Sequence, residues 1–131
     1  MAEILSLAAG SLLGGFGRHF LGGAIQRLAG GSFPYGTLLI NLAGCFIIGL
    51  LHSLASSKLS LSANAKMLLI VGFCGAFTTF STFILETSAA MDQGRHVQAL
   101  SYLLVSVLLG FACFRIGIQA RHLIPFLSPL S

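Results

Sequence analysis

The chain has 131 residues, of which 56% are hydrophobic and only 8% are charged, and its formal net charge is +4. Soluble domains carry about a quarter charged residues, so this composition excludes a water-soluble globular domain, and the small, scattered charge excludes a nucleic-acid-binding face. A membrane-spanning helix needs about 20 mainly apolar residues. Four stretches meet this requirement and predict an all-α integral membrane protein with a single transmembrane domain over residues 1–131: about 4–28, 36–55, 63–91 and 97–118.

The first predicted helix carries glycines and one charged residue at membrane depth. Gly10 and Gly14 are four residues apart, a spacing that lets another helix approach closely. Arg18 follows on the same helix. A charge at this depth normally faces a partner or a water-filled cavity, but a long side chain can also extend to the membrane interface. Both readings of Arg18 remain open.

The second predicted helix places Thr37, Asn41 and Gly44 on one face at helical spacing. Asn41 is the notable residue, because its carboxamide offers two donor protons and an acceptor that lipid cannot satisfy. An asparagine in this position either joins two helices through hydrogen bonds or contributes to a polar path across the membrane. The residues alone do not separate these alternatives.

The third predicted helix is unusually polar for its depth. Ser62 is the predicted N-cap. Residues 72–83 have the sequence GFCGAFTTFSTF, in which glycine and threonine weaken a helix. Non-helical backbone survives at membrane depth only where protein or water shields it. The stretch predicts a helix that is broken inside the membrane. Free carbonyls at the end of its first half would suit a cation, and free amides at the start of its second half would suit an anion.

Aromatic residues follow this break at helical spacing. Phe80 and Phe83 are three residues apart, and Thr79, Phe83 and Glu86 follow at i, i+4 and i+7. Phenyl edges carry partial positive charge and could contact a partly dehydrated anion; the alternative is ordinary core packing. Glu86 is the only acid predicted at membrane depth, so the sequence provides no carboxylate pair, and we predict that the protein is not an enzyme.

The fourth predicted helix aligns Tyr102, Ser106 and Gly110, each four residues apart. Its two hydroxyls form either a track of hydrogen-bond donors or, in the case of the serine, a local bond to the helix backbone. The three cysteines each fall within a predicted span without metal-binding spacing, and we predict that they are small packing residues: Cys45, Cys74 and Cys113.

The connecting segments leave the orientation in the membrane open. Four spans place both termini and the middle connection on one side. Lys58 and Lys66 lie on that side, and Arg27 and Arg95 lie on the other. Lys and Arg favour the cytoplasm, but the two sides carry equal numbers of these residues. The sequence therefore predicts one of two arrangements. Either the chain inserts in both orientations, or basic residues of the C-terminal segment keep the termini in the cytoplasm.

Three ordered motifs make the chain resemble the Fluc/CrcB family of fluoride channels over nearly its whole length: GSLLGGFGRH at 10–19, GTLLINLAG at 36–44 and GFCGAFTTFSTF at 72–83, followed by Glu86. His19 stands where tyrosine is usual in the family, and Ser11 stands where a second glycine is usual. Tyr102 and Ser106 form a weaker fourth match.

This resemblance implies a multi-pass channel in the bacterial inner membrane that passively and electrogenically exports cytoplasmic fluoride and so lowers its toxicity. It implies an antiparallel, dual-topology homodimer with two pores, which agrees with the equal numbers of Lys and Arg residues in the connections on the two sides of the membrane. The expected partners are therefore the fluoride ion, the lipid bilayer and a second copy of the chain, and no nucleic acid.

The resemblance also implies roles for individual residues. The fluoride pore would combine one amide, two phenyl rings and four hydroxyls: Asn41, Phe80, Phe83, Ser81, Thr82, Tyr102 and Ser106. Arg18 and Glu86 would line a vestibule. The backbone carbonyls of Gly75 and Thr78 from both subunits would hold a structural Na⁺ at the dimer interface, in keeping with the preference of hard cations for oxygen ligands.

Two other functions compete with this interpretation. A small proton-coupled exporter of lipophilic cations can also have four helices and dual topology, but it would need an intramembrane acid early in the chain and tryptophan near its substrate. Glu3 is the only acid before the third helix, and tryptophan is absent. A membrane scaffold without transport activity would leave Asn41 and the hydroxyls of the third helix with no role beyond joining helices.

Overall fold

The computed structural model describes residues 1–55 and 61–121. The described residues form helices and connections without a β-strand. Four helical segments are long and apolar enough to cross a membrane: Ala2–Ala29, Tyr35–Ala55, Ala63–Asp92 and His96–Ala120. The prediction of an all-α protein with four such segments is confirmed.

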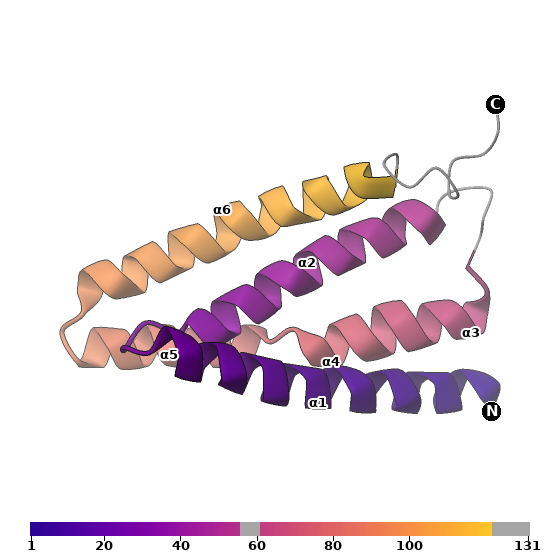
Figure 1. Ribbon diagram of the computed structural model, residues 1–131, viewed down its shortest axis with the longest axis horizontal. Coiled ribbons are helices and arrows are strands. Elements are labelled where there is room, and N and C mark those ends of the chain that lie inside the picture. The colour runs from indigo at the N-terminus through magenta and orange to yellow at the C-terminus, as the bar shows by residue number, and fades with distance from the viewer. Residues whose placement is uncertain (56–60, 122–131) are drawn as a thin grey trace.

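The four segments run alternately in opposite directions along the long axis (Figure 1). Helix α1 (Ala2–Ala29) lies beneath the first half of the third segment, and α2 (Tyr35–Ala55) packs most extensively against α6 (His96–Ala120). The beginning of α1 and the end of α6 lie at the same end of the molecule. Short connections between long apolar helices produce this antiparallel order, because each helix must turn back at the membrane surface.

The third segment consists of several helical pieces. It begins with α3 (Ala63–Lys66), continues as a π-helix, η1 (Met67–Cys74), and ends its first half with α4 (Gly75–Phe77). The Oγ of Ser62 accepts a hydrogen bond from the backbone N–H of Ala65 at 3.2 Å, so the predicted N-cap is confirmed.

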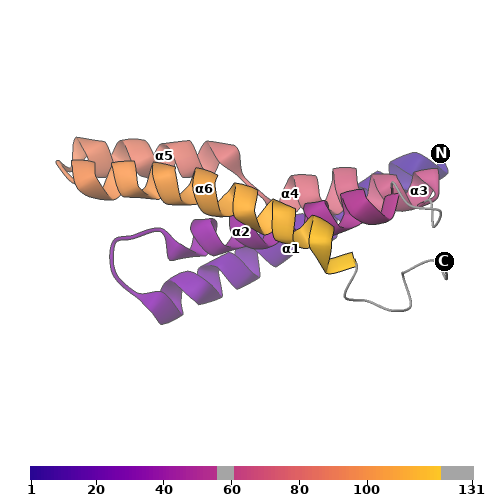
Figure 2. The same ribbon diagram turned by 90° about the horizontal axis from the view of Figure 1, so that it is seen from above.

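The second half of this segment is a separate helix, α5 (Phe80–Asp92). Thr78 has φ −86° and ψ 158°, and Thr79 has φ −148° and ψ 116°. Both residues are therefore extended, and the chain between Phe77 and Phe80 is not helical. Figure 2 shows this extended connection, after which α5 lies beside the first part of α6.

Glycines allow α1 to lie directly against the first half of the third segment. A Cβ atom at Gly14 would overlap the carbonyl oxygen of Phe73 and would lie 3.0 Å from the backbone nitrogen of Phe77. A Cβ atom at Gly72 would lie 3.0 Å from the Cα of Gly10. The predicted close approach at Gly10 and Gly14 is confirmed, and the partner of α1 is the segment formed by η1 and α4.

Replacement of Gly14 by alanine is expected to lower the thermal stability of the purified protein in detergent. The added methyl group meets backbone atoms, which cannot move aside cheaply, and overpacking of this kind costs about 1–3 kcal/mol. Gly15→Ala is the matched control, because nothing lies within 4 Å of a Cβ at that position. Alanine favours a helix over glycine by about 1 kcal/mol, so Gly15→Ala should keep or raise the melting temperature. Equal melting temperatures for both variants would contradict the close contact.

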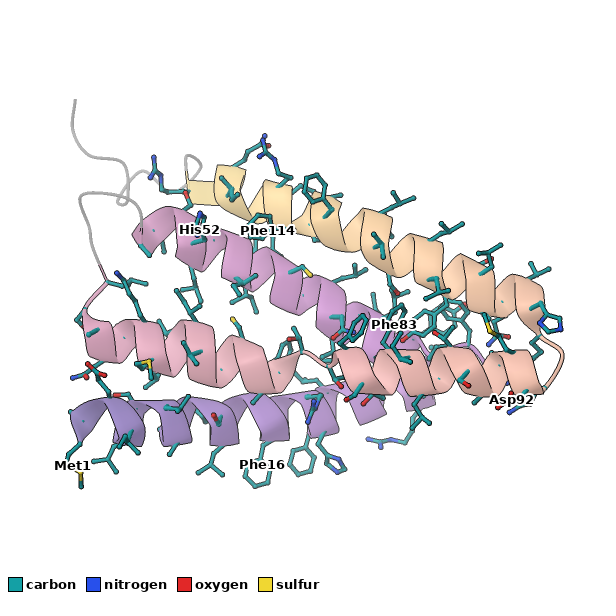
Figure 3. The ribbon with its side chains drawn as sticks, turned by 180° about the vertical axis from the view of Figure 1, so that it is seen from behind. Met1, Phe16, His52, Phe83, Asp92 and Phe114 are labelled. Atoms are coloured by element: carbon teal, nitrogen blue, oxygen red, sulfur yellow. The ribbon has the colours of Figure 1, made fainter. Side chains whose placement is uncertain are left out.

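The side chains divide into a small interior cluster and a large apolar exterior. Leu38, Phe83 and Tyr102 are buried together where α2, α5 and α6 meet. Phe16 on α1 is 60% exposed, and its side chain extends away from the bundle (Figure 3). In a protein whose solvent is lipid, such exposed apolar side chains are the expected outer surface.

Candidate functional site

Asn41 binds the backbone at the point where the third segment is interrupted. Its Nδ2 donates to the carbonyl oxygen of Thr79 at 3.0 Å, and the backbone N–H of Thr79 donates to Oδ1 of Asn41 at 2.8 Å. In a continuous α-helix this N–H would donate to the carbonyl of Gly75. The amide of Asn41 therefore replaces a helical hydrogen bond. The structure thus contains the interhelical bond that was one of the two alternatives. An amide nitrogen donates two protons, and among the described residues the second Nδ2 proton of Asn41 has no acceptor.

Arg18 contacts the other residue of the interruption. Its Nη1 donates to the carbonyl oxygen of Thr78 at 3.4 Å. Of the two readings of Arg18, the structure supports the one with a protein partner. The side chain of Thr78 bonds back to the carbonyl oxygen of Cys74 at 2.9 Å. The extended backbone is thus held from α1 as well as from α2, so its shape depends on residues that are far away in the sequence.

Thr79 also begins the second half-helix. Its Oγ1 accepts from the backbone N–H of Thr82 at 3.3 Å and hydrogen bonds with the hydroxyl of Thr82 at 2.9 Å. An N-cap of this kind satisfies amide groups that the first helical turn leaves unpaired. The hydroxyl of Thr82 therefore has an intrachain partner, a contact that spacing alone did not predict.

Glu86 joins three helical segments through its carboxylate. Thr37 on α2 donates to Oε1 at 2.8 Å, and Tyr102 on α6 donates to Oε2 at 2.9 Å. Tyr102 is only 1% exposed. Helical spacing predicted Tyr102 beside Ser106 on a hydroxyl track, and it predicted Thr37 only on the face of α2 that carries Asn41. Their meeting at Glu86 was not predicted, because nothing in the local spacing of one helix identifies a residue on another.

The two phenylalanines of the predicted pore have opposite environments. Phe83 is 5% exposed, and its ring meets the ring of Tyr102 at 4.9 Å with an interplanar angle of 73°. Figure 3 shows Phe83 directed into the space beside α2. Phe80 is 75% exposed, although the centres of the two phenyl rings are only 5.8 Å apart. Core packing explains Phe83, but within one chain it does not explain Phe80.

Ser106 carries an unpaired polar atom. Its Oγ is buried and has no hydrogen-bond partner among the described residues. The alternative in which this hydroxyl bonds to its own helix backbone is therefore wrong. A buried polar group without a partner costs about 1–3 kcal/mol. Its position in the largely apolar groove suits a hydroxyl that donates to something outside the chain.

Most of the candidate residues line one of two pockets, each of about 560 Å³. The first, here called the polar pocket, opens where α1 ends and α2 begins, and its lining includes Arg18, Thr37, Thr82, Glu86 and Arg95. The second, called the apolar groove, lies between α2 and the third segment, and its lining includes Asn41, Gly75, Thr78, Phe80, Phe83 and Ser106. Thr79 lines both pockets. Of the remaining predicted residues, Tyr102 is buried and Ser81 is exposed, and neither lines either of these two pockets.

Comparison with known proteins places this arrangement in a family. The family described as "CrcB-like protein, Camphor Resistance (CrcB)" matches residues 5–118. A protein of Dehalococcoides mccartyi named fluoride-specific ion channel FluC is 45% identical over 117 residues, which are 89% of this chain and 90% of the relative.

Two further relatives carry the same name. The one from Nitrobacter winogradskyi is 39% identical over 121 residues, covering 92% of this chain and 96% of the relative. The one from Nitratidesulfovibrio vulgaris is 36% identical over 124 residues, covering 95% of this chain and all of the relative. The family match spans all three motifs and the residues that line both pockets, and the chain therefore belongs to the CrcB family.

Proposed function

We propose that this chain is a fluoride-specific ion channel that passively and electrogenically exports fluoride from the cytoplasm. The names of its relatives support the choice of ion. The structural observation that carries the proposal is the buried, unpaired hydroxyl of Ser106 in the groove that also contains Phe80 and Phe83. A donor without a partner among the described residues, placed beside phenyl rings, is suited to a small anion that has lost part of its water.

Permeation then follows from the groups that line the groove. Fluoride binds water tightly, so the path must replace this water stepwise. The Ser106 hydroxyl, the second Nδ2 proton of Asn41 and the positive edges of the phenyl rings would each replace part of it. Several weak sites in sequence allow an ion to leave as well as to bind. Strong binding at a single site would instead trap the ion.

The vestibule role of Arg18 and Glu86 rests on the polar pocket that both residues line. Arg18 supplies positive charge that attracts anions. Both carboxylate oxygens of Glu86 accept hydrogen bonds from hydroxyls, which spreads its negative charge and reduces its repulsion of an approaching anion. Ser81 and Thr82 would complete the polar path between this pocket and the groove.

The functional unit proposed here is an antiparallel, dual-topology homodimer with two pores in the bacterial inner membrane. The balanced Lys and Arg residues of the connections support insertion in both orientations. Phe80 is exposed, and the apolar groove is open on one chain. A second subunit covering this face would enclose the groove and give Phe80 a protein environment.

A structural Na⁺ is the cofactor proposed for the interruption of the third segment. Backbone carbonyls suit a hard cation. The carbonyl of Gly75 loses its usual helical donor, because the N–H of Thr79 is bound to Asn41. Gly75 is also exposed. The carbonyl of Thr78 already accepts from Arg18, and its second lone pair remains for the ion. The carbonyls of Gly75 and Thr78 from both subunits would together bind one Na⁺ ion and stabilise the dimer.

The test is fluoride efflux from liposomes that contain the purified protein, with a potassium ionophore present to balance charge. Rapid efflux that requires the ionophore is the expected result, because an electrogenic pathway stops when charge accumulates. Absence of efflux from verified dimers would overturn the proposal. Proton-dependent uptake of a lipophilic cation in the same vesicles would instead support the exporter alternative.

A further inference from the structure

Arg95 has a setting that neither the predicted pore nor the family comparison explains. It lies in the turn after α5, whose last residue, Asp92, is labelled in Figure 3, and it precedes α6. Its side chain lines the polar pocket together with Arg18. The pocket thus contains a guanidinium from each of two separate parts of the chain.

The guanidinium of Arg95 is held by neutral acceptors. Its Nη1 donates to Oε1 of Gln98 at 3.2 Å and to the carbonyl oxygen of Ser32 at 3.5 Å, and its Nη2 donates to Oε1 of Gln93 at 2.5 Å. None of these three acceptors is a carboxylate. Within the described part of the chain, its positive charge is therefore bound by neutral groups, and the carboxylate that lines the same pocket, Glu86, accepts from Thr37 and Tyr102 instead.

The same contacts fix the position of Arg95. Gln98 donates from Nε2 to the carbonyl oxygen of Ser32 at 3.0 Å, and its Oε1 accepts from the Ser32 hydroxyl at 3.4 Å. Gln98 thereby connects the loop after α1 to the start of α6, with Arg95 bound to both. The Nε of Arg95 is buried and has no partner within the residues that the structure describes. An arginine that is held in place by neutral acceptors keeps its full charge and is a preorganised anion-binding group.

From these observations we infer that Arg95 captures small hydrated anions at the rim of the polar pocket, before they reach Arg18. The pocket is lined by two arginines, Arg18 and Arg95, and one carboxylate, Glu86. A net positive charge in a cleft raises the local concentration of anions and their rate of association, and this effect decreases with ionic strength. The inference rests on the proposed fluoride transport, and it adds a residue that sets the rate of fluoride capture at sub-saturating concentrations.

The experiment measures fluoride efflux from liposomes at low and high ionic strength, adjusted with an impermeant salt, with fluoride kept below saturation. Arg95→Gln removes the charge, and Arg95→Lys keeps it. Arg27→Gln is the matched control, because Arg27 is exposed at the same end of the molecule and does not line the pocket.

At low ionic strength, Arg95→Gln should lower the efflux rate by roughly three- to ten-fold, whereas Arg95→Lys and Arg27→Gln should stay within about two-fold of the parent protein. The deficit of Arg95→Gln should largely disappear near ~1 M salt, where the Debye length falls to about 3 Å.

Two results would overturn the role of Arg95 while leaving the proposed function intact. The first is an equal loss in Arg95→Gln and Arg95→Lys at every ionic strength, which would make the residue a structural clamp. The second is parent-like efflux in Arg95→Gln at low salt. Absence of efflux from the parent protein would instead contradict the proposed function itself.

Discussion

Asn41→Asp is expected to reduce fluoride efflux by about 100-fold or more. The carboxylate can still accept from the N–H of Thr79, but it can no longer donate to the carbonyl oxygen that lies 3.0 Å from Nδ2 in the native protein. Two acceptors would then face each other without a proton between them, which costs about 1–3 kcal/mol. An ionised carboxylate at this position would also repel fluoride by about 3 kcal/mol at a separation of ~5 Å and an effective dielectric constant of ~20.

The matched control for this substitution is Asn64→Asp. Asn64 is exposed on α3 and lines neither pocket. Efflux should remain near the parent rate in this variant, although the chemical change is the same. The measurement is the initial rate of efflux per verified dimer in liposomes with a potassium ionophore. Efflux near the parent rate in Asn41→Asp would show that neither the bond to Thr79 nor the neutral charge at this position matters for transport.

Phe80→Ile is expected to lower fluoride efflux by at least about ten-fold while leaving the stability of the chain unchanged. A contact between a phenyl edge and an anion worth about 1.4 kcal/mol corresponds to this factor. Isoleucine keeps the apolar character but lacks the ring quadrupole. Because Phe80 is 75% exposed on one chain, its replacement leaves no cavity within the chain.

Phe83→Ile should impair efflux to a similar extent and should also destabilise the protein. Phe83 is buried against Tyr102 in an edge-on arrangement, and aromatic pairs of this kind contribute about 0.5–1.5 kcal/mol beyond the buried area. Phe16→Ile is the control for both variants, because Phe16 faces outward on α1. Efflux and thermal melting in detergent separate the two effects. Full transport in both Phe80→Ile and Phe83→Ile would remove the phenyl edges from the mechanism.

Local patterns sufficed for some features of the site. The N-cap at Ser62 and the close helix approach at Gly10 and Gly14 both occur in the structure. Each depends on properties of neighbouring residues: a hydroxyl just before a helix satisfies amides of the first turn, and small residues spaced by four form a shallow face on one helix. The identity of the facing segment was not contained in either pattern.

Polar contacts at membrane depth are the features that the sequence left open. Arg18 had two readings and Asn41 had two, and only the positions of Thr78 and Thr79 show which partners they bind. The reading in which Ser106 bonds to its own helix was wrong. These outcomes depend on which helices lie side by side, and a polar side chain in lipid takes whichever partner the packing brings within reach.

The sequence by itself therefore determined the four apolar helical segments. The length and the apolar composition that a bilayer requires of a spanning helix are local properties of the chain. The tertiary structure decided how the polar residues are divided between the polar pocket and the apolar groove. It also decided that Glu86 joins Thr37 and Tyr102. Hydrogen bonds between helices require specific distances and directions, and these exist only once the helices have packed.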